Sequence, residues 1–180
     1  MSLVRFSQPL PDAAMTRPIS HRNLPQLLLK TREALLSHFR LIINHFGLTE
    51  QQWRIIRTLD EYGEMEPNQL CEACQILSPS MTGVLSRMKA LNLVDRQRVA
   101  TDQRRIRISL TPLSKDLCAR MAPLIETQYA LIEKTVGSTL LNDTYAQLDR
   151  LLGAALHEIP AVELPDIPHQ NKRITPRRNL

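Results

Sequence analysis

The sequence has few aromatic residues and lacks a long apolar run. Aromatic side chains make up only 4% of the 180 residues, so a core must rest on Leu, Ile, Val and Met, which favours helices. No run of about 18 or more apolar residues occurs, and no signal-peptide core is seen. The three cysteines lack the even number and the spacing of a secreted disulfide scaffold. We therefore expect a cytoplasmic protein with no membrane segment.

Common enzyme and metal motifs are also missing. The five histidines form no His-Glu-x-x-His motif, and neither a glycine-rich phosphate loop nor a Gly-x-Ser-x-Gly elbow occurs. His38 and His45 lie seven residues apart on one predicted helix, without the surrounding carboxylates that a metal sensor needs. We expect no enzyme activity, no metal site and no cofactor.

Charge and proline define the ends of the chain. The formal net charge is +5, which fits a polyanionic partner or a charge that serves solubility alone. Prolines interrupt residues 1–22, which we interpret as a flexible arm, and residues 158–180, a tail that ends in a basic cluster. A solvated tail is favoured over an arm that binds DNA. One folded domain is expected between them, over residues 23–157.

Helical periodicity covers the first half of that domain. Apolar residues at spacings of three, four and seven predict a helix over residues 24–46. Thr49 can cap a second helix that ends near Tyr62, and Pro67 can begin a short third helix. After a tight turn, Ser78 can cap and Pro79 can open a fourth helix, which we call the reader helix, running to about Leu91.

The period then changes to that of strands. Residues 94–99 and 105–110 alternate polar with apolar side chains, and residues 100–104 between them predict a hairpin tip. Thr111 and Pro112 can open another helix that stops at Gly137, and a last helix follows. The fold class is mainly α with a small β-hairpin.

Two helices joined by a tight turn and followed by a basic hairpin form the arrangement that places a helix in a DNA major groove. Along the reader helix, one side is apolar: Met81, Val84, Leu85, Met88 and Leu91. The DNA contacts that we expect from this segment are Ser78, Pro79, Ser80, Thr82, Gly83, Ser86 and Arg87. The pattern alone fits an ordinary amphipathic surface helix equally well.

The hairpin favours the DNA interpretation because most of the positive excess lies there. It carries Arg96, Arg98, Arg104, Arg105 and Arg107 against Asp95 and Asp102. From the tip, Arg104 can enter a minor groove, while Arg105 and Arg107 share one face. Asp102 can hold the guanidinium of Arg104 or simply shape the turn. Arg96, Asp102, Arg104 and Arg105 join the expected DNA-binding set.

These segments resemble the MarR family. The resemblance rests on the run from Ser78 to Met88, on Leu93-Val94, on Asp102-Gln-Arg-Arg105 and on Leu110-Thr111. It implies a winged helix-turn-helix protein that acts as a homodimeric transcriptional regulator on a pseudo-palindromic DNA operator. Residues of about 49–111 would bind DNA, and helices of about 24–46 and 112–157 would form the dimer.

The sequence departs from the family pattern at three positions. Gly83 stands where many members carry Arg, so one expected DNA contact is absent. Asn92 replaces a common Gly, and Asn is the next best residue for a left-handed turn. Ser114 also replaces a common Gly.

A closer resemblance concerns the ligand. Residues 31–40, 48–57 and 76–80 look like the subgroup that represses operons for degradation of homoprotocatechuate and 4-hydroxyphenylacetate. This implies a repressor that is released by a small aromatic carboxylic acid, bound where the first and second helices meet. Candidate ligand-binding residues there are Arg32, His38, Arg40, Trp53 and Arg54. Alternatively, Trp53 belongs to the core and the arginines are solvated or bridge subunits.

Two other functions stay open at this point. Cys71 and Cys74 form a Cys-x-x-Cys pair that would suit a thiol-based redox sensor, although a lone pair is insufficient for zinc. A nonspecific architectural DNA-binding protein would need the basic hairpin but no effector cavity. Loss of DNA binding under peroxide would favour the first, and a lack of operator selectivity would favour the second.

Overall fold

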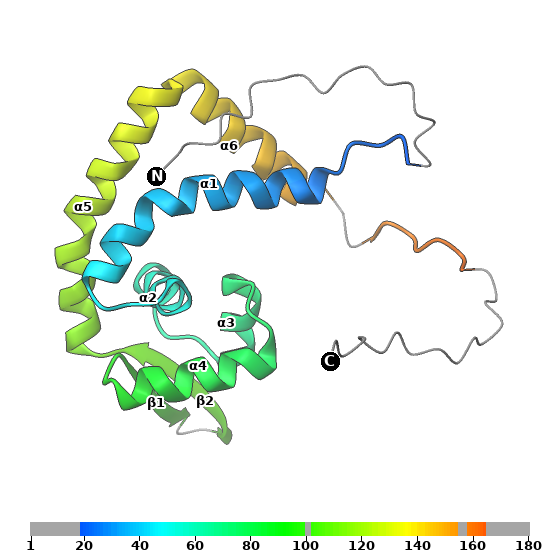
Figure 1. Cartoon of the computed structure of the whole chain (residues 1–180). Helices are drawn as coiled ribbons and strands as arrows, with labels where there is room; N and C mark the ends of the chain where they lie inside the picture. Colours follow the sequence, from blue (N-terminus) through cyan, green and yellow to red (C-terminus); the bar gives the residue numbers. More distant parts are fainter. Residues whose placement is uncertain (1–18, 100–101, 155–157, 165–180) are drawn as a thin grey trace, which may run out of the picture. The chain divides into compact units, whose positions relative to one another are not determined.

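The computed structural model describes residues 19–99, 102–154 and 158–164. Six helices and one hairpin occur in these residues (Figure 1). In chain order they are α1 (Leu24–His45), α2 (Glu50–Tyr62), α3 (Pro67–Cys74), α4 (Ser78–Ala90), β1 (Val94–Val99), β2 (Asp102–Leu110), α5 (Pro112–Val136) and α6 (Ser138–Gly153). The chain forms two compact units, Met1–Gln128 and Tyr129–Leu180. Most of the predicted terminal arm and tail, residues 1–18 and 165–180, lies outside the described residues.

Side-chain caps begin the first two helices, and the cap of the second, Thr49, was predicted. The side chain of Asn23 accepts a hydrogen bond from the backbone N–H of Gln26 at 2.9 Å at the start of α1. Thr49 and Gln52 form a reciprocal capping box at the start of α2. Between the two helices, Gly47 has a φ of 71°, a left-handed conformation that glycine adopts without a Cβ clash. These local signals fix where α1 ends and α2 begins.

The turn between α3 and α4 corrects one predicted cap. Gln75 takes the left-handed conformation that closes α3, as the short turn requires. The N-cap of α4 is Leu77, however, and Ser78 is already the first helical residue, with no side-chain capping bond. Pro79 is tolerated in the first turn because the N–H groups there have no intrahelical acceptor.

The core of the first unit is built from aliphatic and methionine side chains, as the low aromatic content predicts. Four of the five predicted apolar residues of α4 are buried, namely Met81, Val84, Leu85 and Met88. Leu91 is the exception, with 56% of its surface exposed. The helix ends at Ala90, and Leu91 is its C-cap. Leu91 therefore does not continue the buried face of α4. Other fully buried members include Ile55, Ile56, Leu70, Ile108 and Met121.

The hairpin is antiparallel, and its second strand begins earlier than predicted. Val94 pairs with Leu110 and Arg98 with Ile106, and the register becomes irregular between Arg98 and Val99. The residues from Asp102 to Arg104 belong to β2 rather than to a loop. Ala100 and Thr101, the rest of the predicted tip, lie outside the described residues. β2 also bonds the segment before α3, where Met65 and Ile108 exchange backbone hydrogen bonds of 3.0 and 2.8 Å.

The start of α5 ties it to the hairpin. Thr111 caps the helix, accepting from the backbone N–H of Ser114 at 3.3 Å. Ser114 is fully buried, and its hydroxyl donates to the carbonyl of Leu93 at 2.6 Å. The preceding turn uses Asn92 with a φ of 55°, which confirms its predicted left-handed conformation. Ser114 therefore contributes a hydrogen bond that glycine at this position would lack.

The second unit contains the end of α5 and α6. Gly137 separates these helices, as predicted. No described residue of α6 is buried, and the helix exposes Leu140, Tyr145, Leu148 and Leu152. Among the described residues, no helix is long and apolar enough to cross a membrane.

Candidate nucleic-acid interface and neighbouring cavity

The outer face of α4 is polar and accessible. Ser78, Pro79, Ser80, Thr82, Ser86 and Arg87 are all exposed, and Gly83 is half-buried. The hydroxyl of Thr82 donates to the carbonyl of Ser78 at 3.4 Å. A Cβ added at Gly83 would lie 3.5 Å from the guanidinium of Arg87, so Arg87 lies over the glycine. This face offers hydroxyls and the cation of Arg87, which can bond base edges or phosphates.

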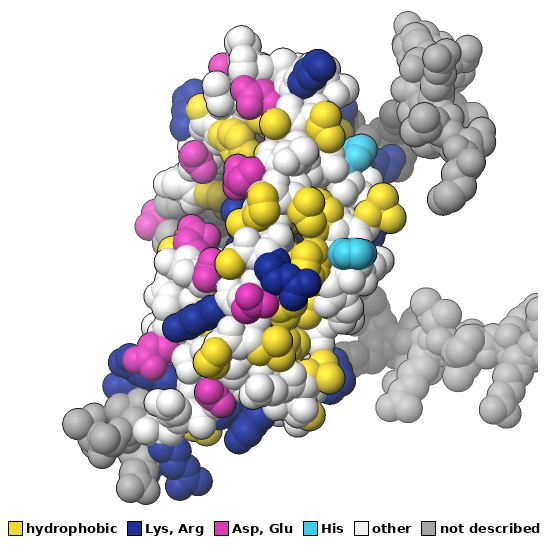
Figure 2. Space-filling model, turned by 90° about the vertical axis from the view of Figure 1, so that its left-hand side faces the viewer, with side chains coloured by type: hydrophobic (Ala, Val, Ile, Leu, Met, Phe, Trp, Pro, Cys, Tyr) yellow, Lys and Arg dark blue, Asp and Glu magenta, His cyan; other side chains and the backbone are white. Residues whose placement is uncertain are grey.

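The hairpin adds positive charge beside α4. Arg96, Arg98, Arg104 and Arg105 are exposed, and Figure 2 shows Lys and Arg side chains gathered at the lower end of the view, where the hairpin lies. Asp102 accepts a hydrogen bond from the backbone N–H of Arg104 at 3.0 Å. Of its two predicted roles, Asp102 thus shapes the backbone, and no ion pair with the Arg104 guanidinium is found among the described residues.

Two arginines of β2 are held by glutamates that the sequence analysis missed. Arg105 donates to Glu66, at 2.8 Å from Nε, and this hydrogen bond raises the pKa of its guanidinium. Arg107 pairs with Glu64 at 2.7 Å. These contacts fasten β2 to the segment that begins α3. No ion pair is found for Arg104 in the described part of the chain, which leaves its charge available to a partner.

A cavity of about 320 Å³ lies between α1, α2 and α3. Three of the five predicted ligand-binding residues, Arg32, Trp53 and Arg54, line it. The rest of the lining consists of Leu36, Glu50, Arg57, Thr58, Glu61, Tyr62 and Ala73. His38 is exposed on α1 and is not part of this lining. Trp53 is half-buried, so its side chain is neither fully inside the core nor fully exposed to solvent.

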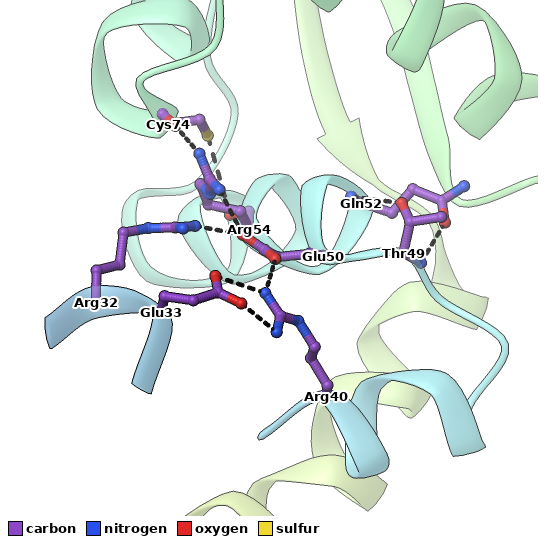
Figure 3. A network of polar contacts seen from close by, with 8 residues as sticks. All are labelled: Arg32, Glu33, Arg40, Thr49, Glu50, Gln52, Arg54 and Cys74. Carbon is purple, nitrogen blue, oxygen red and sulfur yellow. Dashed lines mark hydrogen bonds and ion pairs between the residues drawn. The ribbon is translucent and has the colours of Figure 1, made fainter. Parts of the chain in front are cut away.

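Glu50 is the centre of a polar network beside this cavity (Figure 3). Its carboxylate pairs with Arg32, with Arg54 at 3.0 Å and with Arg40 at 3.5 Å. Arg40, the fourth predicted ligand-binding residue, also pairs with Glu33 at 2.5 Å. Burial acts to raise the pKa of the Glu50 carboxyl, but the hydrogen bonds from Arg32 and Arg54 outweigh it and lower that pKa.

Sequence reasoning did not identify Glu50 as part of the site. The available signal was its spacing of four residues from Arg54, a helical ion-pair distance. The contacts from α1 depend on tertiary packing and carry no local signal.

A second cavity, of about 310 Å³, lies between α2 and α5. Its apolar lining includes Cys118, Ala122 and Ile125, and its charged lining is Arg57, Asp60, Glu61 and Glu126. Trp53 lines both cavities, as do Arg57 and Glu61. Arg57 was not among the predicted ligand-binding residues, although it lies one turn beyond Trp53 on the same helix face.

The three cysteines are free, and two of them, Cys74 and Cys118, are poorly suited to thiolate chemistry. Cys74 is buried, and its thiol contacts the hydroxyl of Thr58 at 3.4 Å. Burial raises the pKa of Cys74, and it raises that of Cys118 to about 11. Cys71 is half-buried. Groups of three or more potential metal ligands are absent from the described residues.

The comparisons with known proteins agree with the geometry. A sequence model of the MarR family matches residues 46–105. The HTH-type transcriptional regulator FarR of Neisseria gonorrhoeae is 37% identical over 134 residues, which cover 73% of this chain and 92% of that relative. The homoprotocatechuate degradative operon repressor of Escherichia coli is 44% identical over 113 residues, which cover 63% of this chain and 76% of that relative.

A solved structure supports the fold at the level of coordinates. The crystal structure of NadR in complex with 4-hydroxyphenylacetate is 34% identical in sequence, with a TM-score of 0.68. The match covers 78% of this chain and 99% of NadR. With the relatives above, it shows that the chain belongs to the MarR family of winged helix-turn-helix transcriptional regulators.

Proposed function

We propose that this regulator is a homodimeric repressor of an operon for aromatic-acid catabolism, and that a small aromatic carboxylic acid releases it from DNA. The observation that carries the proposal is the cavity between α1, α2 and α3, where a half-buried tryptophan meets several arginines. One relative is named for the homoprotocatechuate operon, and a solved neighbour holds 4-hydroxyphenylacetate. Both compounds are hydroxylated arylacetates.

The cavity has the size and chemistry for such a ligand. Its volume of about 320 Å³ lies within the range of small-molecule sites, which begins at roughly 300 Å³. The indole of Trp53 offers an apolar surface for the ring, and a guanidinium of Arg54 or Arg57 can bond the carboxylate. Arg32, His38 and Arg40 complete the proposed ligand-binding set from α1.

DNA binding is proposed for α4 and the hairpin. The exposed hydroxyls of α4 and Arg87 would lie in a major groove. Arg104, which has no ion pair among the described residues, would reach the flanking minor groove. Arg96 and Arg98 lie on the neighbouring strand and would contact phosphates. Because Arg105 is already bound to Glu66, we assign it mainly to positioning the hairpin.

A homodimer is proposed because one copy leaves apolar helix faces uncovered. The α1 helix exposes Leu24, Leu27 and Leu28, and α6 exposes Leu140, Leu148 and Leu152. Covering these faces with a second copy would place two α4 helices on successive major grooves, about one helical turn of DNA apart. A ligand that favours another spacing would then weaken operator binding, with a coupling of about 1 to 3 kcal/mol.

The test combines ligand binding with operator release. Genomic fragments selected by the purified protein supply the operator. Calorimetry should then detect binding of 4-hydroxyphenylacetate, and the same acid should release the operator in a gel-shift titration. Trp53→Ala should weaken acid binding at least about tenfold, the value of a large stacking contact, whereas the exposed Lys30→Ala should match the wild type. Operator binding that no aromatic acid alters would contradict the proposal.

A further inference from the structure

One carboxylate, that of Glu50, holds three guanidinium groups from two helices. Arg32 and Arg40 reach it from α1, and Arg54 reaches it from the next turn of α2. Glu50 is only 27% exposed, less than any of its partners. It therefore occupies the place that the carboxylate of an acidic ligand would take among the same donors.

Arg54 extends this network toward the DNA-reading part of the chain. Its Nη2 bonds Glu50, while its Nη1 donates to the backbone carbonyl of Cys74 at 2.8 Å (Figure 3). Cys74 ends α3, where carbonyls have no partner within the helix. Only residues 75–77 separate this helix end from α4. The side chain of Arg54 thus joins the cavity to the turn that positions α4.

We propose that Glu50 is an internal counter-ion which an acidic effector must displace, and that this exchange draws Arg54 away from the carbonyl of Cys74. The proposal rests on the proposed function, since it takes the cavity beside Glu50 as the effector site. In the empty protein, Glu50 holds Arg54 in the orientation that supports the end of α3. An incoming carboxylate bonds Arg54 and Arg32 from the cavity side, and Glu50 loses both partners.

The exchange explains how the cavity selects for charge. Arg32 and Arg54 are already paired with Glu50, so a neutral ligand gains nothing by approaching these two arginines and has no means of competing with Glu50. A ligand carboxylate offers the same kind of acceptor oxygen as Glu50, which accepts from both Arg32 and Arg54 through Oε1. Acid affinity is therefore the difference between two similar ion pairs, which makes it sensitive to the charge at position 50.

The test compares Glu50→Gln with Glu61→Gln. Both variants remove one negative charge from the cavity lining, but Glu61 has no ion pair with an arginine among the described residues. Calorimetry uses 4-hydroxyphenylacetate and the uncharged 4-hydroxyphenylacetamide as probes. Glu50→Gln should tighten acid binding about three- to tenfold, the scale of one charge-assisted hydrogen bond on a partly exposed pair. Amide affinity should stay the same, and Glu61→Gln should give a smaller gain for the acid.

Operator binding gives an independent readout. Without effector, Glu50→Gln should bind operator about threefold or more weakly, because a variant that favours the effector-bound state must disfavour the other. Circular dichroism and thermal unfolding confirm that each variant is folded. Arg54→Lys keeps the charge but cannot bond Glu50 and the Cys74 carbonyl at the same time. It should therefore also bind operator more weakly without effector, and it should respond less to the acid.

The outcomes separate this inference from the proposed function. If the wild type binds no aromatic acid, the effector assignment fails. If the wild type binds the acid and Glu50→Gln leaves its affinity unchanged or lowers it, then Glu50 is not a competitor and the inference is wrong. An equal gain for acid and amide would likewise contradict displacement of a counter-ion.

Discussion

The helices α4 and α6 are of similar length but differ in what covers them. Within its own chain α4 buries Met81, Val84, Leu85 and Met88, and it exposes a polar face. No described residue of α6 is buried, although the helix carries as many large apolar side chains. The fold of one copy therefore accounts for the position of α4, whereas nothing in the described part of one copy explains the apolar stripe of α6.

The spacing of that stripe indicates a partner helix. Tyr145, Leu148 and Leu152 recur at intervals of three and four residues, so they share one face of α6. Complete burial of such side chains contributes about 1.5 to 3 kcal/mol each. Figure 2 also shows hydrophobic side chains among the charged ones on the face that it presents. A second copy with the same stripes would bury them symmetrically.

The largest expected effect follows from placing a charge on this stripe. We predict that Leu148→Asp yields a monomer, because an aspartate cannot be buried in an apolar interface without a partner. Operator affinity should fall about 100-fold or more, since the two half-sites would no longer be bound together. Analytical ultracentrifugation and a gel shift measure the two effects. Gln147→Asp, which adds the same charge at an exposed polar neighbour, is the control, and a dimeric Leu148→Asp protein would contradict the proposed interface.

The next largest effect concerns the stability of the core that one copy forms by itself. Met88 is fully buried, so Met88→Ala should lower the free energy of unfolding by about 2 to 5 kcal/mol. In a monomer made by Leu148→Asp, a further Leu152→Ala change should cost less than about 0.5 kcal/mol, because Leu152 is 78% exposed in a single copy. Urea denaturation of both proteins checks the contrast. Comparable losses at the two positions would mean that α6 is packed within its own chain.

A smaller effect distinguishes two neighbouring arginines of the hairpin. Arg104→Ala should weaken operator binding about five- to tenfold and make the salt dependence shallower by about one phosphate contact. Arg105→Ala should have a weaker effect on the salt slope, because its charge is already paired with Glu66. Gel shifts over a series of salt concentrations measure both slopes. Equal changes would show that Arg105 leaves Glu66 to contact DNA.

The sequence predicted the order of elements because the relevant signals are local. Caps such as Thr49, the prolines at helix starts and the change of period after Leu93 each act within a few residues. Boundaries were less accurate where local signals compete. Ser78 is a good capping residue, yet it is the first residue of α4 and Leu77 is the N-cap. Likewise, β2 takes up part of the predicted turn.

The candidate site was only partly predictable, for a physical reason. Exposure of the α4 face follows from helical periodicity, so its polar residues were found. The partners of charged side chains depend on how distant segments pack. Glu50 joins arginines 18 and 10 residues away, and Glu66 lies 39 residues from Arg105. No spacing rule connects such pairs, so the arginines could be predicted from the sequence but their glutamate partners could not.

The smallest expected effect concerns Cys74, whose thiol is buried in the core of the first unit. Because Cys74 is buried, we expect that peroxide leaves operator binding unchanged. The raised pKa keeps this thiol protonated at neutral pH, and the thiolate is the form that peroxide oxidises. The thiolate fraction would grow only as the pH rises toward that raised pKa. Gel shifts after peroxide treatment, with a Cys71→Ser, Cys74→Ser double variant as control, measure the effect. Peroxide-dependent release that the double variant abolishes would instead establish a redox sensor and show that α3 opens readily.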